Sequence, residues 1–91
     1  MNSGIYILKW EDCPYYYYGS SKDLERRKRN HFNRLKNGKH ENFILLGLYI
    51  KYGLPKFEVL EYCKADEIKA SEQCYLDKAK CDANNVNLAV S

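Results

Sequence analysis

The stretch YYYYGSSKDLERRKRNH, residues 15–31, joins four consecutive tyrosines to the densest positive charge in the chain. Aromatic residues closed by a glycine predict a strand, with Gly19 turning the chain toward the next element. Ser20 or Ser21 can cap a helix, and acidic residues suit its first turn, so a basic helix is expected next. This junction of a strand and a cationic helix is the centre from which the rest of the chain can be interpreted.

The whole chain, residues 1–91, is predicted to form one α/β domain, because its length leaves no room for a second core. Hydrophobic periodicity predicts three strands and three helices in the order ββααβα. The strands are expected at 4–10, 15–19 and 54–63, and the helices at 20–38, 41–53 and 65–81. The simplest arrangement is a small three-stranded, mainly antiparallel sheet flanked by three helices.

The second predicted helix, residues 41–53, is apolar nearly all round. Such a helix is usually buried on every side, whereas a surface helix keeps one polar face. We therefore expect it to be well buried or to have a partner. Gly53 is expected to close its C-terminal end.

The composition excludes several classes of protein. With 45% hydrophobic and 30% charged residues, the chain has the composition of a globular domain and not of a disordered one. No apolar run approaches the roughly 20 residues of a membrane helix, and no signal-peptide pattern is present. We therefore expect a soluble, intracellular protein with no membrane partner. The four cysteines form no C-x-x-C pair and are expected to be free thiols.

Positive charge is concentrated between residues 22 and 40. This block has eight Lys or Arg against two acidic residues, whereas the rest of the chain has seven against ten. Charge alone leaves two interpretations open, a binding site for a polyanion and an ordinary solvated helix face. The residues suited to contact DNA are Lys22, Arg26, Arg29, Arg34, Lys36 and Lys39.

Two polar residues of the first predicted helix lie where apolar ones are expected. On a helical wheel, His31 falls on the core-facing stripe with Leu24 and Leu35, and Arg27 falls at its edge. The neighbouring arginines point well away from this stripe. Because buried arginine is rare unless it is paired, Arg27 requires an explanation.

Glu72 is the matching exception in the third predicted helix. It lies within an apolar face, one turn after Ile68 and one turn before Leu76. An unpaired carboxylate there would cost several kcal/mol or take up a proton. Two solutions remain open: a structural ion pair with Arg27, or a metal ion bound by Glu72 while Arg27 faces a substrate anion.

The tyrosines add hydroxyl groups to this set. Tyr6 and Tyr17 flank the predicted hairpin and can be cross-strand neighbours with converging hydroxyls. Tyr16 and Tyr18 share the opposite face of the second strand and are expected to pack as an aromatic ladder. A hydroxyl next to an arginine and a glutamate can position a water molecule.

Taken in order, short segments of the chain resemble the GIY-YIG endonuclease family. They are GIY (4–6), YYG (17–19), GSSKDLERRKRNH (19–31), KYG (51–53), EQCYLD (72–77) and NVNLA (85–89). The family usually has an aliphatic residue where this chain has Tyr18, a side chain that packs and does not react. The resemblance covers nearly the whole chain and is closest to the nuclease modules of phage- and intron-type homing endonucleases.

The resemblance implies a DNA endonuclease that uses Mg²⁺ or Mn²⁺ and leaves 5′-phosphate and 3′-hydroxyl ends. It implies that Glu72 is the metal ligand and that Arg27 stabilises the transition state, while Tyr6 or His31 takes the proton of the attacking water. The implied catalytic residues are Tyr6, Tyr17, Arg27, His31, His40, Glu72 and Asn87. Two alternatives stay open: a nucleic-acid-binding module without catalysis, and the nuclease part of a larger homing or repair enzyme whose DNA-targeting domain or protein is separate.

Overall fold

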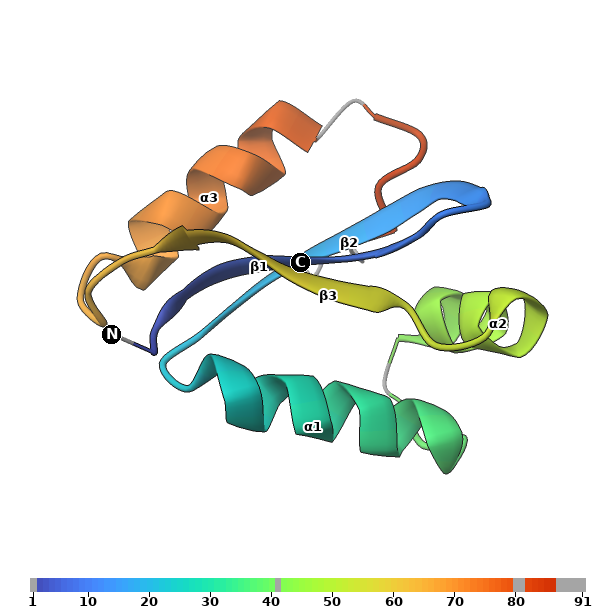
Figure 1. Ribbon diagram of the computed structural model, residues 1–91. Helices are drawn as coiled ribbons and strands as arrows, with labels where there is room; N and C mark the ends of the chain where they lie inside the picture. The colour runs from blue at the N-terminus through green and yellow to red at the C-terminus, as the bar shows by residue number, and fades with distance from the viewer. Residues whose placement is uncertain (1, 41, 80–81, 87–91) are drawn as a thin grey trace.

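The computed structural model, which describes residues 2–40, 42–79 and 82–86, has a three-stranded sheet between two layers of helix (Figure 1). The sheet is antiparallel with the strand order β2-β1-β3, so β1 is central and β2 is an edge strand. The elements are β1 (Gly4–Trp10), β2 (Cys13–Ser21), α1 (Leu24–Lys36), α2 (Phe43–Tyr52), β3 (Lys56–Tyr62) and α3 (Ile68–Ala79). The predicted fold class and element order are confirmed.

Each face of β1 has its own core. Tyr6, Leu8 and Trp10 point to the α1 and α2 side, where they pack with buried leucines of both helices. Ile5 points to the other side and packs with Cys63 and Ile68 under α3. The alternation along β1 therefore places the tyrosine of GIY in the larger core, between the sheet and α1.

The N-terminus of α1 differs from the prediction. The N-cap is Asp23, whose side chain accepts a hydrogen bond from the backbone N–H of Arg26 at 3.2 Å. Ser20 and Ser21 instead extend β2, since Ser21 pairs with Gly4 at the start of β1. A serine can serve either as a cap or as a strand residue, and here the sheet pairing determines the outcome.

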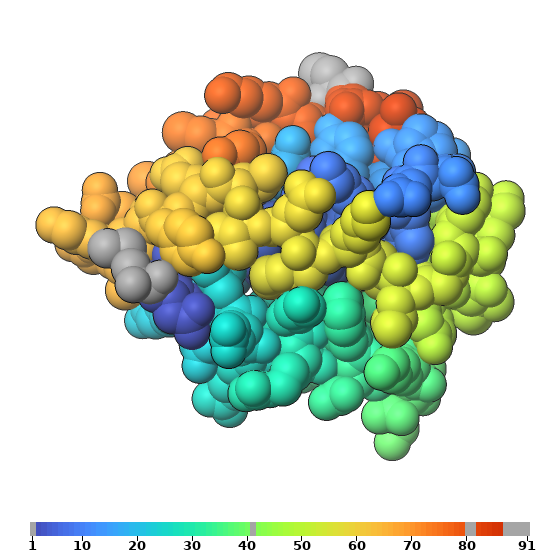
Figure 2. Space-filling model, in the orientation of Figure 1, coloured from blue at the N-terminus to red at the C-terminus, as the bar shows by residue number. Residues whose placement is uncertain are grey.

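Helix α2 is not well buried by this chain. Its N-cap is Asn42, and Gly53 closes it with a positive φ of 88°. Leu45 is fully buried, but the side chains of Phe43 and Ile50 are 80% and 77% exposed. Figure 2 shows α2, in yellow-green, at the end of the molecule.

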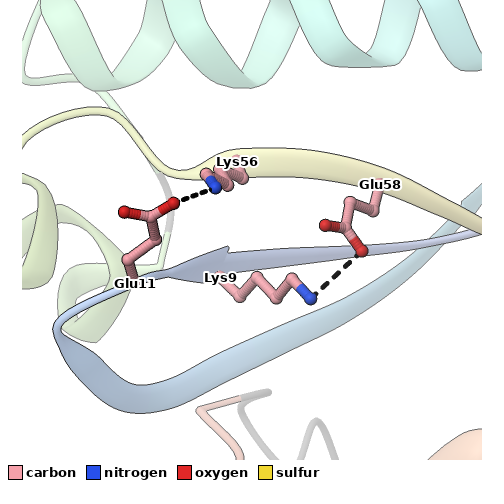
Figure 3. Close-up of polar contacts among 4 residues, drawn as sticks. All are labelled: Lys9, Glu11, Lys56 and Glu58. Atoms are coloured by element: carbon pink, nitrogen blue, oxygen red, sulfur yellow. Dashed lines mark hydrogen bonds and ion pairs between the residues drawn. The ribbon is translucent and has the colours of Figure 1, made fainter.

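Two cross-strand ion pairs join β1 and the turn after it to β3 (Figure 3). Lys9 Nζ lies 3.1 Å from Glu58 Oε2, and Lys56 contacts Glu11. All four side chains are 43% or more exposed, so water and salt screen both pairs and their contribution to stability is small. They align the two strands but are not the main source of stability.

Two expectations from composition can be compared with the structure. Across the described ranges, no helix is long and apolar enough to span a membrane. Cys13, Cys63 and Cys74 are free thiols, the first two of them buried, and Cys81 lies outside the described residues.

Candidate active site

A cleft of about 820 Å³ lies at the β2 edge of the sheet, between α1 and the start of α3. The two helices cover opposite faces of the sheet (Figure 1). Ser20 and Ser21, at the end of β2, line the cleft between them. Its lining is predominantly positive, with five cationic side chains against three acidic ones. The cationic ones are Lys22, Arg26, Arg27, Arg34 and Lys69, and the acidic ones are Asp23, Asp66 and Glu72.

Arg27 and Glu72 reach this cleft from the two opposite helical layers. Arg27 is exposed and Glu72 is half-buried. Within the part of the chain that the structure describes, no ion pair joins them. The ion pair considered from the helical wheel is therefore not formed, and both charges face the cleft where a ligand could meet them.

Tyr6 is almost fully buried, with 1% of its surface exposed, and its ring lies against Gly19 of the edge strand. A Cβ atom at position 19 would lie 2.2 Å from Tyr6 Cζ and 2.3 Å from its hydroxyl oxygen. Gly19 belongs to β2 and has no positive φ, so it does not act as a turn residue as predicted. Its role is to leave room for the phenol of Tyr6.

Tyr6 and Tyr17 are cross-strand neighbours, as predicted, although they are not directly opposite each other. The register pairs Tyr6 with Gly19 and Leu8 with Tyr17, so the two tyrosines are diagonal neighbours on one face. The cause is an irregularity next to the turn. Trp10 pairs with Cys13 but Lys9 with Tyr16, which inserts two residues into β2 and shifts every later pair.

The two tyrosines meet at His31. The ring centroids of Tyr6 and Tyr17 lie 5.5 and 5.7 Å from that of His31, both in edge-to-face geometry. Tyr6 also stacks on Phe57 of β3 at 4.5 Å. The predicted position of His31 on the core-facing stripe is confirmed, since it is only 6% exposed. The predicted ladder of Tyr16 and Tyr18 is also confirmed, with ring centroids 5.1 Å apart.

A chain of hydrogen bonds runs inward from Tyr6. The hydroxyl of Tyr6 lies 2.5 Å from Nε2 of His31, and Nδ1 of His31 lies 2.8 Å from Nε2 of His40. The two imidazole planes are nearly parallel, with an interplanar angle of 16°, and His40 is 8% exposed. The structure thus joins Tyr6, His31 and His40 in one hydrogen-bonded chain.

Burial shifts the pKa values of His31 and Tyr6 in opposite directions. It lowers the pKa of His31 to about 3, with further lowering by His40 and by the charges of Arg27 and Arg34. His31 is therefore neutral near pH 7. Burial also raises the pKa of Tyr6 well above its usual range, and Tyr17 and Glu72 add to this, whereas Arg27 opposes it.

The model of the GIY-YIG catalytic domain matches residues 2–84, which is most of the chain. The chain belongs to the GIY-YIG family. Among solved structures, the catalytic domain of the homing endonuclease I-TevI is 30% identical with a TM-score of 0.82, covering 97% of this chain and 99% of that one. A mutant of the same I-TevI domain is also 30% identical with a TM-score of 0.83, covering 100% and 97%. Among curated proteins no match was found.

Asn42 is a residue of this GIY-YIG nuclease domain that the sequence analysis missed. Its backbone N–H donates to Nδ1 of His40 at 3.1 Å, and its side-chain oxygen caps α2 through Ile44 and Leu45. Its amide nitrogen donates to the backbone oxygen of Val86 at 3.0 Å. The signal that could have indicated it is an asparagine directly before an apolar helix, a common N-cap position.

The predicted DNA contacts fall into three groups. Lys22, Arg26 and Arg34 line the cleft of the GIY-YIG domain. Arg29 and Lys36 line a separate groove of about 430 Å³ that is formed by residues of α1 alone. Lys39 is exposed beyond the end of α1 and lines neither. The basic block is therefore distributed around the helix, and only part of it faces the cleft.

Of the three acidic side chains that line the cleft, only that of Glu72 is half-buried; Asp66 is exposed, and Asp23 is exposed and caps α1. Nowhere in the described residues do three or more His, Cys, Asp or Glu side chains form a group able to hold a metal. A half-buried carboxylate in an open, positive cleft therefore fits a cation that keeps most of its ligands as water or substrate oxygens. Asn87, the remaining predicted site residue, lies outside the described residues.

Proposed function

We propose that this protein is a DNA endonuclease that hydrolyses phosphodiester bonds with the help of Mg²⁺ or Mn²⁺. The observation that carries the proposal is the meeting of Arg27 and Glu72 in one cleft, without an ion pair between them, in a chain of the GIY-YIG family. A purely structural role for these charges would favour their pairing, since each would then neutralise the other. Both similar solved structures are of the catalytic domain of a homing endonuclease.

The positive lining of the cleft supports a phosphate-rich substrate. Arg26 and Arg34 flank Arg27 along α1, and Lys22 lies at its N-terminal end. Such side chains bind the DNA backbone by charge and carry no information about base sequence. We therefore propose weak, salt-sensitive binding, with target selection supplied by a separate DNA-targeting domain or protein.

Glu72 would hold the metal ion. Mg²⁺ is commonly bound by one or two carboxylates together with waters and substrate phosphates, so a site built on Glu72 needs no larger group of protein ligands. When bound, the ion neutralises charge on the scissile phosphate and stabilises the leaving oxygen.

Arg27 would donate hydrogen bonds to the phosphate as negative charge builds in the transition state, a role that suits a planar guanidinium. Tyr6 would first release its own phenolic proton to solvent water, and the attacking water would then give its proton to the phenolate oxygen of Tyr6, with Tyr17 helping to orient that water. Burial opposes the required loss of the Tyr6 proton, and Arg27 is a charge that favours it. The products would carry 5′-phosphate and 3′-hydroxyl ends.

A plasmid-nicking assay tests this function. The purified chain should convert supercoiled DNA to open circles with Mg²⁺ or Mn²⁺ and stop when EDTA is added. DNA ligase should reseal the nicks without prior kinase treatment, because the ends are a 5′-phosphate and a 3′-hydroxyl. DNA binding with no nicking in either metal would instead identify a binding module without catalysis.

A further inference from the structure

The hydrogen-bond chain behind Tyr6 begins at the backbone N–H of Asn42, and this group sets which atoms donate and which accept. The backbone N–H of Asn42 can only donate, so Nδ1 of His40 must accept at 3.1 Å. A histidine that accepts at Nδ1 has no proton there and carries its single N–H at Nε2. His40 is therefore neutral, with a defined tautomer.

This direction passes from one ring to the next. Nε2–H of His40 faces Nδ1 of His31 at 2.8 Å, so Nδ1 of His31 must accept in turn. A proton on that Nδ1 would place two N–H groups against each other between two buried rings. His31 is then also neutral, in agreement with its lowered pKa, and carries its N–H at Nε2. That nitrogen lies 2.5 Å from the hydroxyl oxygen of Tyr6.

We propose that His40 and the backbone N–H of Asn42 are positioning groups that fix His31 as a hydrogen-bond donor to the Tyr6 oxygen. His31 cannot take the proton of Tyr6 in this arrangement, because its Nε2 already holds one. Instead, its N–H would stabilise the oxygen of Tyr6 when that oxygen becomes negative. The choice between Tyr6 and His31 as the proton acceptor is thereby resolved in favour of Tyr6.

The tautomers can be measured without any DNA. In the protein labelled with ¹⁵N-histidine, long-range ¹H–¹⁵N correlation spectra distinguish protonated from unprotonated ring nitrogens. At pH 7 we expect both histidines to carry the proton on Nε2 and none on Nδ1. A proton on Nδ1 of His31, or a doubly protonated ring, would overturn the proposal.

A matched pair of variants tests whether His40 imposes this direction. In His40→Gln, the amide can still donate to His31, whereas in His40→Glu, the side chain is nearly the same in shape but the carboxylate can only accept. Both lose the ring that accepts from Asn42, so that loss is common to the pair. We expect His31 to keep its proton on Nε2 in the Gln variant and to gain one on Nδ1 in the Glu variant. The same spectrum in both variants would show that His40 does not set the tautomer.

The effect on catalysis rests on the proposed function. Losing a hydrogen bond to a charged oxygen reduces a rate by about 10- to 100-fold. In single-turnover nicking, the Glu variant should therefore be slower than the Gln variant by about this factor. Equal rates would show that the hydrogen-bond chain behind Tyr6 has no role in catalysis. If the unchanged chain does not nick DNA, the proposed function fails, while the spectra still decide the tautomers.

Discussion

The cleft and the histidine chain behind Tyr6 are built on opposite physical grounds. The cleft residues Arg27 and Glu72 are charged, lie at the surface of an open cleft and are not paired with each other. His31 and His40 are neutral, buried and hydrogen-bonded in sequence. The difference indicates that changes in the cleft should remove activity with little effect on stability, whereas changes around Tyr6 should affect both.

Replacing Glu72 should give the largest effect. Glu72→Gln keeps the shape of the side chain but removes the anionic ligand, so nicking should disappear. Since no ion pair to Arg27 is lost among the described residues, the melting temperature should change little. Glu67→Gln is the matched control, because Glu67 is exposed and does not line the cleft. A Glu72→Gln variant that still cuts, or that melts far below the parent, would break the comparison.

Arg27→Ala should follow, with a rate reduced by about 10²–10³-fold, as for the loss of a donor that acts in the transition state. Arg29→Ala is the control on the same helix, because Arg29 lies outside the cleft in the groove formed by α1. It should weaken DNA binding slightly and leave the chemical step unchanged. Single-turnover rates at saturating protein separate the two effects. Equal losses of rate in both variants would show that the arginines of α1 act only by their general positive charge.

Gly19→Ala tests the buried packing around Tyr6. The added Cβ would lie 2.2 Å from Tyr6 Cζ, so the phenol must move. Overpacking of this kind costs about 1–3 kcal/mol in the free energy of unfolding, and the displaced hydroxyl should slow cleavage as well. Gly47→Ala is the same chemical change in α2 with nothing within 4 Å, and it should be neutral or stabilising. Urea unfolding with nicking rates for both variants measures the contrast.

The most gradual effect is on pH dependence. His31 has a pKa of about 3 in the folded chain against 6.5 for an unperturbed histidine. Between these values the unfolded chain binds more protons, so the free energy of unfolding falls as the pH is lowered, by up to about 1.4 kcal/mol per pH unit. Urea unfolding at several pH values should show this slope. His31→Gln should lose that part of it, and an unchanged slope would place the titration elsewhere.

Much of the fold could be predicted because local chemistry and tertiary structure agree. Strand 4–10 alternates side chains between two cores, and its bounds are as predicted. The helical wheel placed His31 correctly because Leu24 and Leu35 define the buried face of α1. Ser21 suits either a helix cap or a strand, and the sequence pattern does not distinguish the two. Its pairing with Gly4 in the sheet determines that it belongs to the strand.

The register around the active site could not be predicted. An uninterrupted hairpin that continues from the pair of Trp10 and Cys13 would place Tyr17 directly opposite Tyr6. The two residues inserted after Cys13, the first of them Pro14, shift the strand so that Gly19 takes that position. Proline cannot donate to a sheet ladder, which explains a bulge there, but not its size. The position of Asn42 likewise depends on contacts far away in the chain.

The bond from Asn42 to Val86 has a consequence for how the protein folds. The segment that presents His40 is secured by a residue 44 positions later, and Val86 itself is held by its backbone N–H to the carbonyl of Tyr16. All three strands end at or before Tyr62, so the whole sheet leaves the ribosome before Val86 does. During synthesis, this part of the site can be completed only after Val86 has left the ribosome. We therefore expect a nascent chain to acquire its sheet before it acquires its full catalytic competence.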